Sequence, residues 1–219
     1  MKKISEIENF WKRLLMCVCG VIICAISVGF FKRAAFGVDP FQAFMAGLNS
    51  VIPVSFGTLY VIANIILLLF ALIADRHYIG LATVINLFLV GYIVDFSHQM
   101  LLRLLPDLGM PGRIVCLLIA IVIMCLASSF YFTANLGVST YDAVALIITG
   151  TWKLGQFRWV RIVTDLVCVA IGVALYLISG GTLSGIGAVA GVGTIITAFF
   201  MGPLIDFFNR RVAQPLLER

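Results

Sequence analysis

The segments GVDPFQA, at residues 37–43, and GVSTYDA, at residues 137–143, decide the fold of this chain. Each segment predicts the start of a helix. Asp39 and Ser139 are favourable N-caps, because their side-chain oxygens can accept a backbone N–H that the first helical turn leaves unpaired. Pro40 fits the first helical position, where its missing N–H is not needed. Both segments follow long apolar runs, so we expect each helix to begin at membrane depth or just beneath the surface.

The third residue after each cap strengthens this interpretation. Gln42 and Asp142 stand where a side chain can reach back to the N–H of the cap itself, as in a capping box. The two short helices are expected at about residues 39–52 and 139–152. This paired element is the predicted centre of the protein.

The composition is that of a polytopic, all-α membrane protein. Of 219 residues, 62% are hydrophobic and 11% are charged, with a mean hydropathy of +1.13. Soluble domains are about 45–50% apolar and about 25% charged. Six apolar runs reach or approach the ~20 residues that a spanning helix needs. The expected spans are residues 10–31, 58–74, 79–104, 114–132, 157–178 and 183–208.

The net charge of +5 is interpreted as a topology signal, because most Lys and Arg residues flank apolar runs. We therefore expect the lipid bilayer, and no nucleic acid, as a partner. The six cysteines lie within apolar runs and lack the spacing of a zinc or redox motif, so no metal site is expected.

An internal duplication is visible in the residues. The chain is expected to form one membrane domain, 1–219, with repeats at 10–105 and 113–211 and a linker at 106–112. With an offset of 100 residues, Arg13 matches Arg113 and Gly37 matches Gly137. With an offset of 111, the matches are Gly80 with Gly191, Thr83 with Thr194, Gly91 with Gly202, and Asp95 with Asp206.

The number of crossings depends on the two short helices. About 14 residues rise only ~21 Å, which is less than the ~30 Å hydrocarbon core. This favours re-entrant or broken helices, six full spans and inverted repeats. If the short helices cross, there are eight spans and the repeats are parallel. Both arrangements place the N- and C-termini in the cytoplasm, on the side with more Lys and Arg.

The two helix starts also predict a binding site. Non-helical backbone at membrane depth must be buried in protein or line a watery cavity. Transporters with internal repeats often bind substrate where such broken helices meet. The predicted substrate-binding residues from these segments are Asp39, Gln42, Asn135, Ser139, Thr140, Tyr141 and Asp142. The alternative is that these side chains only cap two helices.

A second group comes from within the spans. Asp165 and Arg161 lie inside one apolar run at i, i+4 spacing, which allows a direct ion pair. Asn64 lies in the corresponding span of the first half. Ionisable groups at this depth are costly and tend to face a bundle interior or a cavity. The pair is either structurally silent or part of the substrate site, to which we add these three residues.

No enzyme signature is present: the sequence lacks H-E-x-x-H, G-x-S-x-G, a P-loop and a dinucleotide fingerprint. We expect no enzyme, no catalytic residue and no cofactor.

The paired motifs, with the G-x-x-T…G…D-F pattern at residues 80–96 and 191–207, resemble the bacterial YczE/YyaS/YitT-type integral membrane family. The resemblance covers about residues 10–211 and is to the short, YczE-like branch. It implies a multi-pass protein of the bacterial cytoplasmic (inner) membrane, in a family generally described as transporters or permeases. Some members are similar to proteins encoded beside regulators that sense pyridoxal phosphate, which suggests a vitamin B6 vitamer as cargo.

The predicted function is therefore a secondary carrier or permease for a small polar solute, with its site between the two capped helix starts. One alternative is a non-transporting scaffold or a substrate-capturing subunit that needs an energising partner. A channel is a third option, and a homo-oligomer remains open.

Overall fold

The computed structural model describes residues 9–218, apart from the side chain of Arg158; the outermost parts of the expected domain, 1–8 and 219, lie outside these residues. The described chain is helical and contains no strand. The long helices are α1 (Phe10–Ala34), α3 (Phe56–Ala74), α4 (Leu81–Leu104), α5 (Met110–Ala134), α7 (Phe157–Ile178) and α9 (Val192–Phe208). The short ones are α2 (Pro40–Val51), α6 (Thr140–Leu146), α8 (Ile186–Val189) and α10 (Gln214–Glu218).

Further helical turns join these elements. 3₁₀ turns lie at Arg76–Tyr78 and Leu183–Gly185, and π-helical turns at Ile147–Thr151 and Asn209–Ala213. The first π-helical turn continues α6, and the second joins α9 to α10.

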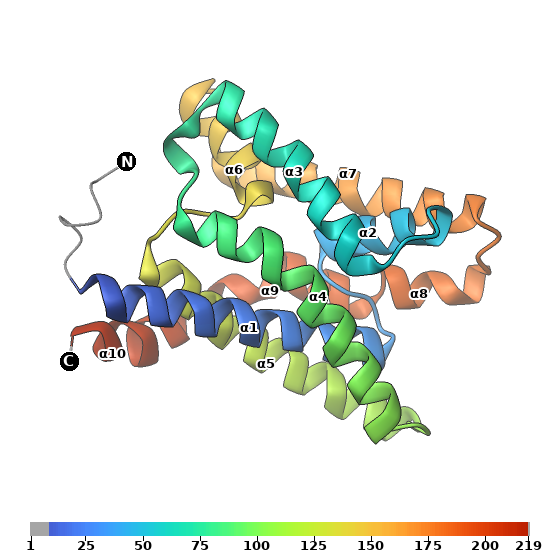
Figure 1. Cartoon of the computed structure of the whole chain (residues 1–219). Helices are drawn as coiled ribbons and strands as arrows, with labels where there is room; N and C mark the ends of the chain where they lie inside the picture. The colour runs from blue at the N-terminus through green and yellow to red at the C-terminus, as the bar shows by residue number, and fades with distance from the viewer. Residues whose placement is uncertain (1–8, 219) are drawn as a thin grey trace.

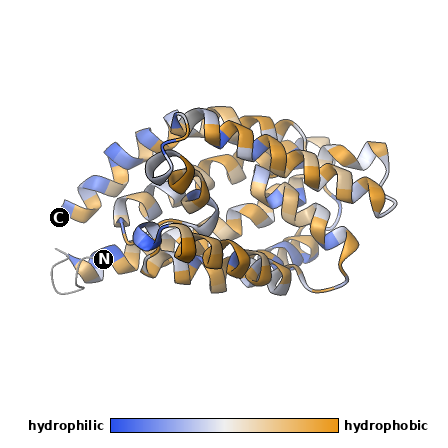
Figure 2. Cartoon of the chain, turned by 90° about the horizontal axis from the view of Figure 1, so that it is seen from above, coloured by the Kyte–Doolittle hydropathy of each residue, from blue (hydrophilic) through white to orange (hydrophobic). Residues whose placement is uncertain are grey.

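Six helical segments of the described chain are long and apolar enough to cross a bilayer, which confirms the preferred prediction of six spans. α2 is not among them, since its 12 residues rise only about 18 Å. The start of α1 and α10 lie at the left of Figure 1, whereas the turns after α4 and α7 lie at the right. Hydrophobic residues cover the helices along most of their length (Figure 2), as contact with lipid requires.

The helices of the two expected repeats interleave. α1 packs along both α5 and α4, α2 packs on α7, and α3 contacts α4 and α6. Three of these pairs, α1 with α5, α2 with α7 and α3 with α6, join the first half of the chain to the second. The start of α2 and the start of α6 therefore lie against helices of the opposite half.

The loops before α2 and α6 require glycine. Gly37 has φ +92° and Gly137 has φ +113°, a region that L-residues rarely adopt. A Cβ on Gly37 would lie 2.3 Å from the backbone nitrogen of Gly191, and one on Gly137 would lie 2.7 Å from the Cα of Gly80. Each loop thus lies directly against the start of a long helix from the other half.

Matching hydrogen bonds join the loops before α2 and α6 to the starts of α9 and α4. The Ala82 N–H donates to the Leu136 carbonyl at 3.0 Å, and the Gly193 N–H donates to the Phe36 carbonyl at 2.7 Å. Arg13 and Arg113 make a second matched pair. The Arg13 guanidinium, on α1, donates to two backbone carbonyls at the end of α5. The Arg113 guanidinium, on α5, donates to two backbone carbonyls at the end of α1. A two-fold relation between the halves would produce these contacts, while the duplication itself stays a prediction.

The two largest differences from the expected bounds lie at the start of α5 and within the last span. α5 begins at Met110, inside the stretch expected as a linker, because Pro111 fits the first turn of a helix. The last expected span, 183–208, is broken at residues 190–191. There the Gly191 N–H donates to the Thr194 hydroxyl at 3.2 Å and α9 starts afresh, as α4 does where the Gly80 N–H donates to Thr83 at 3.1 Å. The extra residues of the second half form the short helical turns before this break.

Candidate functional site

A cavity of about 430 Å³ lies where the start of α2 meets the start of α6. Pockets for small ligands measure roughly 300–1,000 Å³, so the cavity can hold a small molecule. Eight of the ten predicted binding residues line it: Asp39, Gln42, Asn64, Ser139, Tyr141, Asp142, Arg161 and Asp165. Their binding role stays a prediction, but the structure brings them to one place.

The other two predicted residues lie elsewhere. Thr140 is buried and donates its hydroxyl hydrogen to the amide oxygen of Asn64, which ties the start of α6 to α3. The Asn64 amide donates in turn to the Tyr60 carbonyl at 2.8 Å. Asn135 is exposed and ends α5 with φ 51°, a left-handed conformation that Asn tolerates better than most residues. It is absent from the lining of the cavity.

Both predicted N-caps are present. The Gln42 N–H donates to Asp39 Oδ1 at 3.1 Å, and the Asp142 N–H donates to Ser139 Oγ at 3.0 Å. The expected return bonds are wrong in both copies. Gln42 Oε1 is buried without a hydrogen-bond partner among the described residues. Asp142 Oδ2 accepts from the Ser139 hydroxyl at 2.7 Å instead of from the N–H of the cap. Neither side chain therefore completes a capping box among the described residues.

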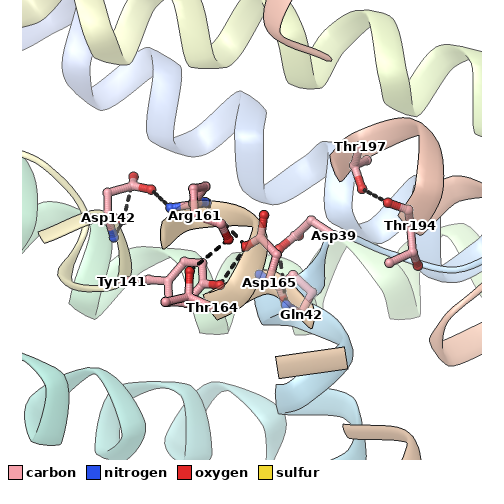
Figure 3. A network of polar contacts seen from close by, with 10 residues as sticks. Asp39, Gln42, Tyr141, Asp142, Arg161, Thr164, Asp165, Thr194 and Thr197 are labelled. Atoms are coloured by element: carbon pink, nitrogen blue, oxygen red, sulfur yellow. Dashed lines mark hydrogen bonds and ion pairs between the residues drawn. The ribbon is translucent and has the colours of Figure 1, made fainter. Parts of the chain in front are cut away.

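A charged network joins α6 to α7 across the cavity (Figure 3). The Arg161 guanidinium forms an ion pair with Asp142 and a second one with Asp165, with 3.3 Å between Nε and Oδ1. The i, i+4 pair is thus confirmed. The Tyr141 hydroxyl donates to Asp165 Oδ1 at 2.6 Å, and the guanidinium carbon of Arg161 lies 4.5 Å from the centroid of the Tyr141 ring.

Asp39 stands outside these ion pairs. It lies beside Asp165 in Figure 3, close enough for the two negative charges to interact. Arg161 is also near enough to attract Asp39, but in the described part of the chain its ion pairs are with Asp142 and Asp165. The ionisable side chains that line the cavity thus include three carboxylates and one guanidinium.

Sequence reasoning did not assign Tyr60, Asn86 or Tyr131 to the site, although all three line the cavity. The Tyr60 hydroxyl donates to Asn86 Oδ1 at 3.3 Å. The Tyr131 hydroxyl is buried with no hydrogen-bond partner among the described residues. A tyrosine within an apolar span is itself a signal, since its hydroxyl needs a partner that a phenylalanine would not need.

The comparisons with known proteins agree with the observed architecture. The chain is 24% identical to "Uncharacterized protein YyaS" of Bacillus subtilis (strain 168) over 200 residues, which is 91% of each chain. It is 26% identical to "Uncharacterized membrane protein YczE" of the same organism over 191 residues, 86% of this chain and 81% of the relative. The resemblance to the YczE/YyaS-type family is thereby confirmed, and with it a multi-pass membrane protein.

No solved structure matches the chain. One family matches almost all of it, from residue 11 to residue 210, and is described as "Family of unknown function (DUF6198)". The match includes both short helices and all the residues that line the cavity, so this chain belongs to the DUF6198 family.

Proposed function

We propose that this protein is a secondary carrier that moves a small polar solute across the membrane and binds it in the cavity between α2 and α6. One observation carries the proposal: the starts of the two short helices α2 and α6 bring polar and charged side chains together around a cavity of about 430 Å³. Polar and ionisable groups inside a membrane protein are costly and tend to mark a solute or ion path. Broken helices that meet between two halves are the usual site of secondary transporters.

The cavity draws on both halves of the chain, as alternating access needs. Asp39 and Gln42 come from the first half, and Asp142, Arg161 and Asp165 come from the second. Rocking of one half against the other would open the site to each side in turn. In this proposal the protein lies in the bacterial inner membrane with both termini in the cytoplasm, and it moves its solute without altering it chemically.

The resemblance to YczE-like proteins makes a vitamin B6 vitamer one candidate solute. A single pyridine ring with small polar substituents is small enough for a cavity of this size. The vitamers differ in charge, so they also serve as useful test compounds: pyridoxamine carries an amine, pyridoxine is uncharged outside its ring, and pyridoxal phosphate is an anion.

The test is uptake into proteoliposomes that contain this protein alone. The vesicles are exposed to pooled metabolites with the three vitamers, and mass spectrometry identifies what enters and whether it is unchanged. The carrier is supported if vesicles with the wild-type protein accumulate a solute above the level in empty vesicles. Vesicles with Asp206→Asn should accumulate it to the wild-type level. Asp206 is exposed and pairs with Arg210 away from the cavity, so it is a matched carboxylate control.

Two other outcomes would count against the carrier. Binding of a solute without uptake would favour the substrate-capturing subunit, which needs an energising partner. If the protein unfolds cooperatively on heating, and is therefore folded, but neither binds nor takes up any compound, the result would favour the non-transporting scaffold.

A further inference from the structure

The lining of the cavity has an excess of negative charge. Asp39, Asp142 and Asp165 contribute carboxylates, and Arg161 contributes the one guanidinium among the described lining residues. Arg161 contacts two of the three carboxylates and is shared between them. Unmatched charge within a membrane protein is costly unless a counter-charge or water accompanies it. The cavity is therefore complementary to a positively charged solute.

Asp39 carries the unmatched charge. Its carboxylate accepts from the backbone N–H of Gln42 at the start of α2. It forms no ion pair in the described part of the chain. Asp165 beside it adds a repulsive interaction. A cation bound at Asp39 would supply the missing ion-pair partner and would offset the repulsion from Asp165.

Two buried oxygens in the cavity wall have no hydrogen-bond partner among the described residues. Gln42 is 4% exposed and Tyr131 is 8% exposed, and neither Gln42 Oε1 nor the Tyr131 hydroxyl has a partner among the described residues. Both residues line the cavity. The amide oxygen can only accept, and the hydroxyl oxygen can accept as well as donate. Buried polar atoms are hydrogen-bonded as a rule, so these two point to a ligand that carries N–H or O–H groups.

Aromatic rings make up another part of the wall. Phe41 stacks on Tyr141 with 4.9 Å between ring centroids, and Phe41 meets Tyr60 edge-on at 5.8 Å. All three residues line the cavity with Tyr131. Aromatic faces attract organic cations and pack well against an apolar body. This wall suits a solute with both a charged group and a carbon skeleton better than it suits a bare metal ion.

We propose that the solute is a small organic cation with a protonated primary amine, whose ammonium group pairs with Asp39. The inference rests on the carrier function proposed above and names its substrate class. The three N–H groups of an ammonium match the acceptors that Asp39, Gln42 and Tyr131 supply to the cavity. An anion is disfavoured, because it would meet three carboxylates and would find the first turn of α2 already bonded to Asp39.

Three probes with one shared ring test the charge requirement: benzylamine, benzyl alcohol and benzoate. Each is titrated at pH 7 into the purified full chain in detergent micelles, with empty micelles as the blank. We expect benzylamine to bind at least tenfold more tightly than benzyl alcohol, and benzoate to show no saturable binding. Equal affinities, tighter binding of benzoate, or binding of none of the three would overturn the amine proposal.

Two variants test the role of Asp39. Asp39→Asn and Asp39→Ser both keep an N-cap oxygen while removing the charge, so each is expected to fold. Benzylamine affinity should fall at least tenfold in both and stay at the wild-type value in Asp206→Asn. Wild-type affinity in both Asp39 variants would show that the carboxylate does not hold the amine. If neither variant unfolds cooperatively, the comparison of the three probes on the wild-type chain decides.

The uptake assay separates this inference from the carrier function. Uptake confined to neutral or anionic solutes would keep the carrier and overturn the amine class. Benzylamine binding that depends on Asp39, with no amine taken up by proteoliposomes, would keep the substrate class and overturn the self-sufficient carrier.

Discussion

Gly47 on α2 and Gly172 on α7 bring the backbones of these two helices into direct contact. A Cβ on Gly47 would lie 2.1 Å from the Gly172 carbonyl oxygen, and a Cβ on Gly172 would lie 2.4 Å from the Ala43 carbonyl oxygen. Small residues allow such close approach between membrane helices. Because Asp39 caps the start of α2 and α7 carries Asp165, this contact sets how far apart the two carboxylates stand.

The first prediction concerns this contact. Gly172→Ala should force α2 and α7 apart, with a loss of about 1–3 kcal/mol of stability, as overpacking usually causes. Uptake should fall as well, because Asp39 moves away from the charged groups of α7. Gly187→Ala is the matched control, since a Cβ there meets no atom within 4 Å. Wild-type uptake and thermal unfolding of Gly172→Ala would contradict the prediction.

Arg113 supplies the second prediction. Its Nε and Nη2 donate to the carbonyls of Ala34 and Ala35 at 2.8 Å each, and the guanidinium carbon lies 4.6 Å from the Phe36 ring centroid. Ala35 has φ 54°, a left-handed conformation that a non-glycine residue adopts at a cost of about 1–2 kcal/mol. The arginine therefore stabilises a strained turn that leads the chain from α1 towards α2.

Arg113→Ala should lower stability by roughly 3 kcal/mol, the lower end for two hydrogen bonds to a charged group at about 1.5–3 kcal/mol each, because the residue is only partly buried. Arg113→Lys should recover only part of this loss, since an ammonium lacks the planar fork of the guanidinium. The measurement is the thermal unfolding midpoint in detergent. Arg103→Ala, at an exposed position of α4, is the control. Full recovery by lysine would show that charge alone matters.

The third prediction separates binding from capping at the start of α6. Asp142→Asn keeps the N–H that Ser139 caps and removes one ion-pair partner of Arg161. We expect uptake to fall at least tenfold, because Arg161 then turns fully to Asp165 and the charge pattern of the cavity changes. Stability should fall by only about 1–3 kcal/mol, the usual contribution of a hydrogen bond to a charged group. Wild-type uptake in Asp142→Asn would restrict the Asp142 carboxylate to a structural role beside Ser139 and Arg161.

Local chemistry explains what the sequence could predict. The caps at Asp39 and Ser139, and the ion pair of Arg161 with Asp165, depend on residues three or four positions apart on one helix. The bounds of α7 at 157 and 178 also agree with the expected span, since a glycine-rich turn follows it. Each of these features is written in a short stretch of chain, so it could be found without knowing the neighbours.

The features that escaped prediction depend on partners far away in the chain. Gly47 meets Gly172 only because α2 packs on a helix of the other half. The break before Gly191 exists where that residue lies against the Phe36 carbonyl. Tyr131 became a candidate for binding only when the structure left its hydroxyl without a partner among the described residues. No local pattern distinguishes Gly47 and Gly172 from other small residues within an apolar helix.

The fourth prediction is the side of the membrane on which each turn lies. Arg76 lies in the turn after α3, and Asp107 lies in the turn between α4 and α5. With six spans and α2 returning to the side it entered from, the turn at Arg76 shares the side of the termini and the turn at Asp107 lies opposite. Arg210 and Arg211 lie at the end of the chain, beyond α9, and the side richer in Lys and Arg faces the cytoplasm.

Single cysteines at these two positions test the arrangement, in a background whose six native cysteines are replaced. Asp107→Cys should react with a membrane-impermeant maleimide in intact cells, and Arg76→Cys should react only after the cells are opened. The reverse pattern would mean that α2 crosses the bilayer or that the whole protein is inverted in the membrane. Labelling of both positions from one side would mean that α4, which separates them, does not cross the bilayer. A crossing α2 would carry Asp39 away from Asp165, and the cavity on which the proposed site depends would not form.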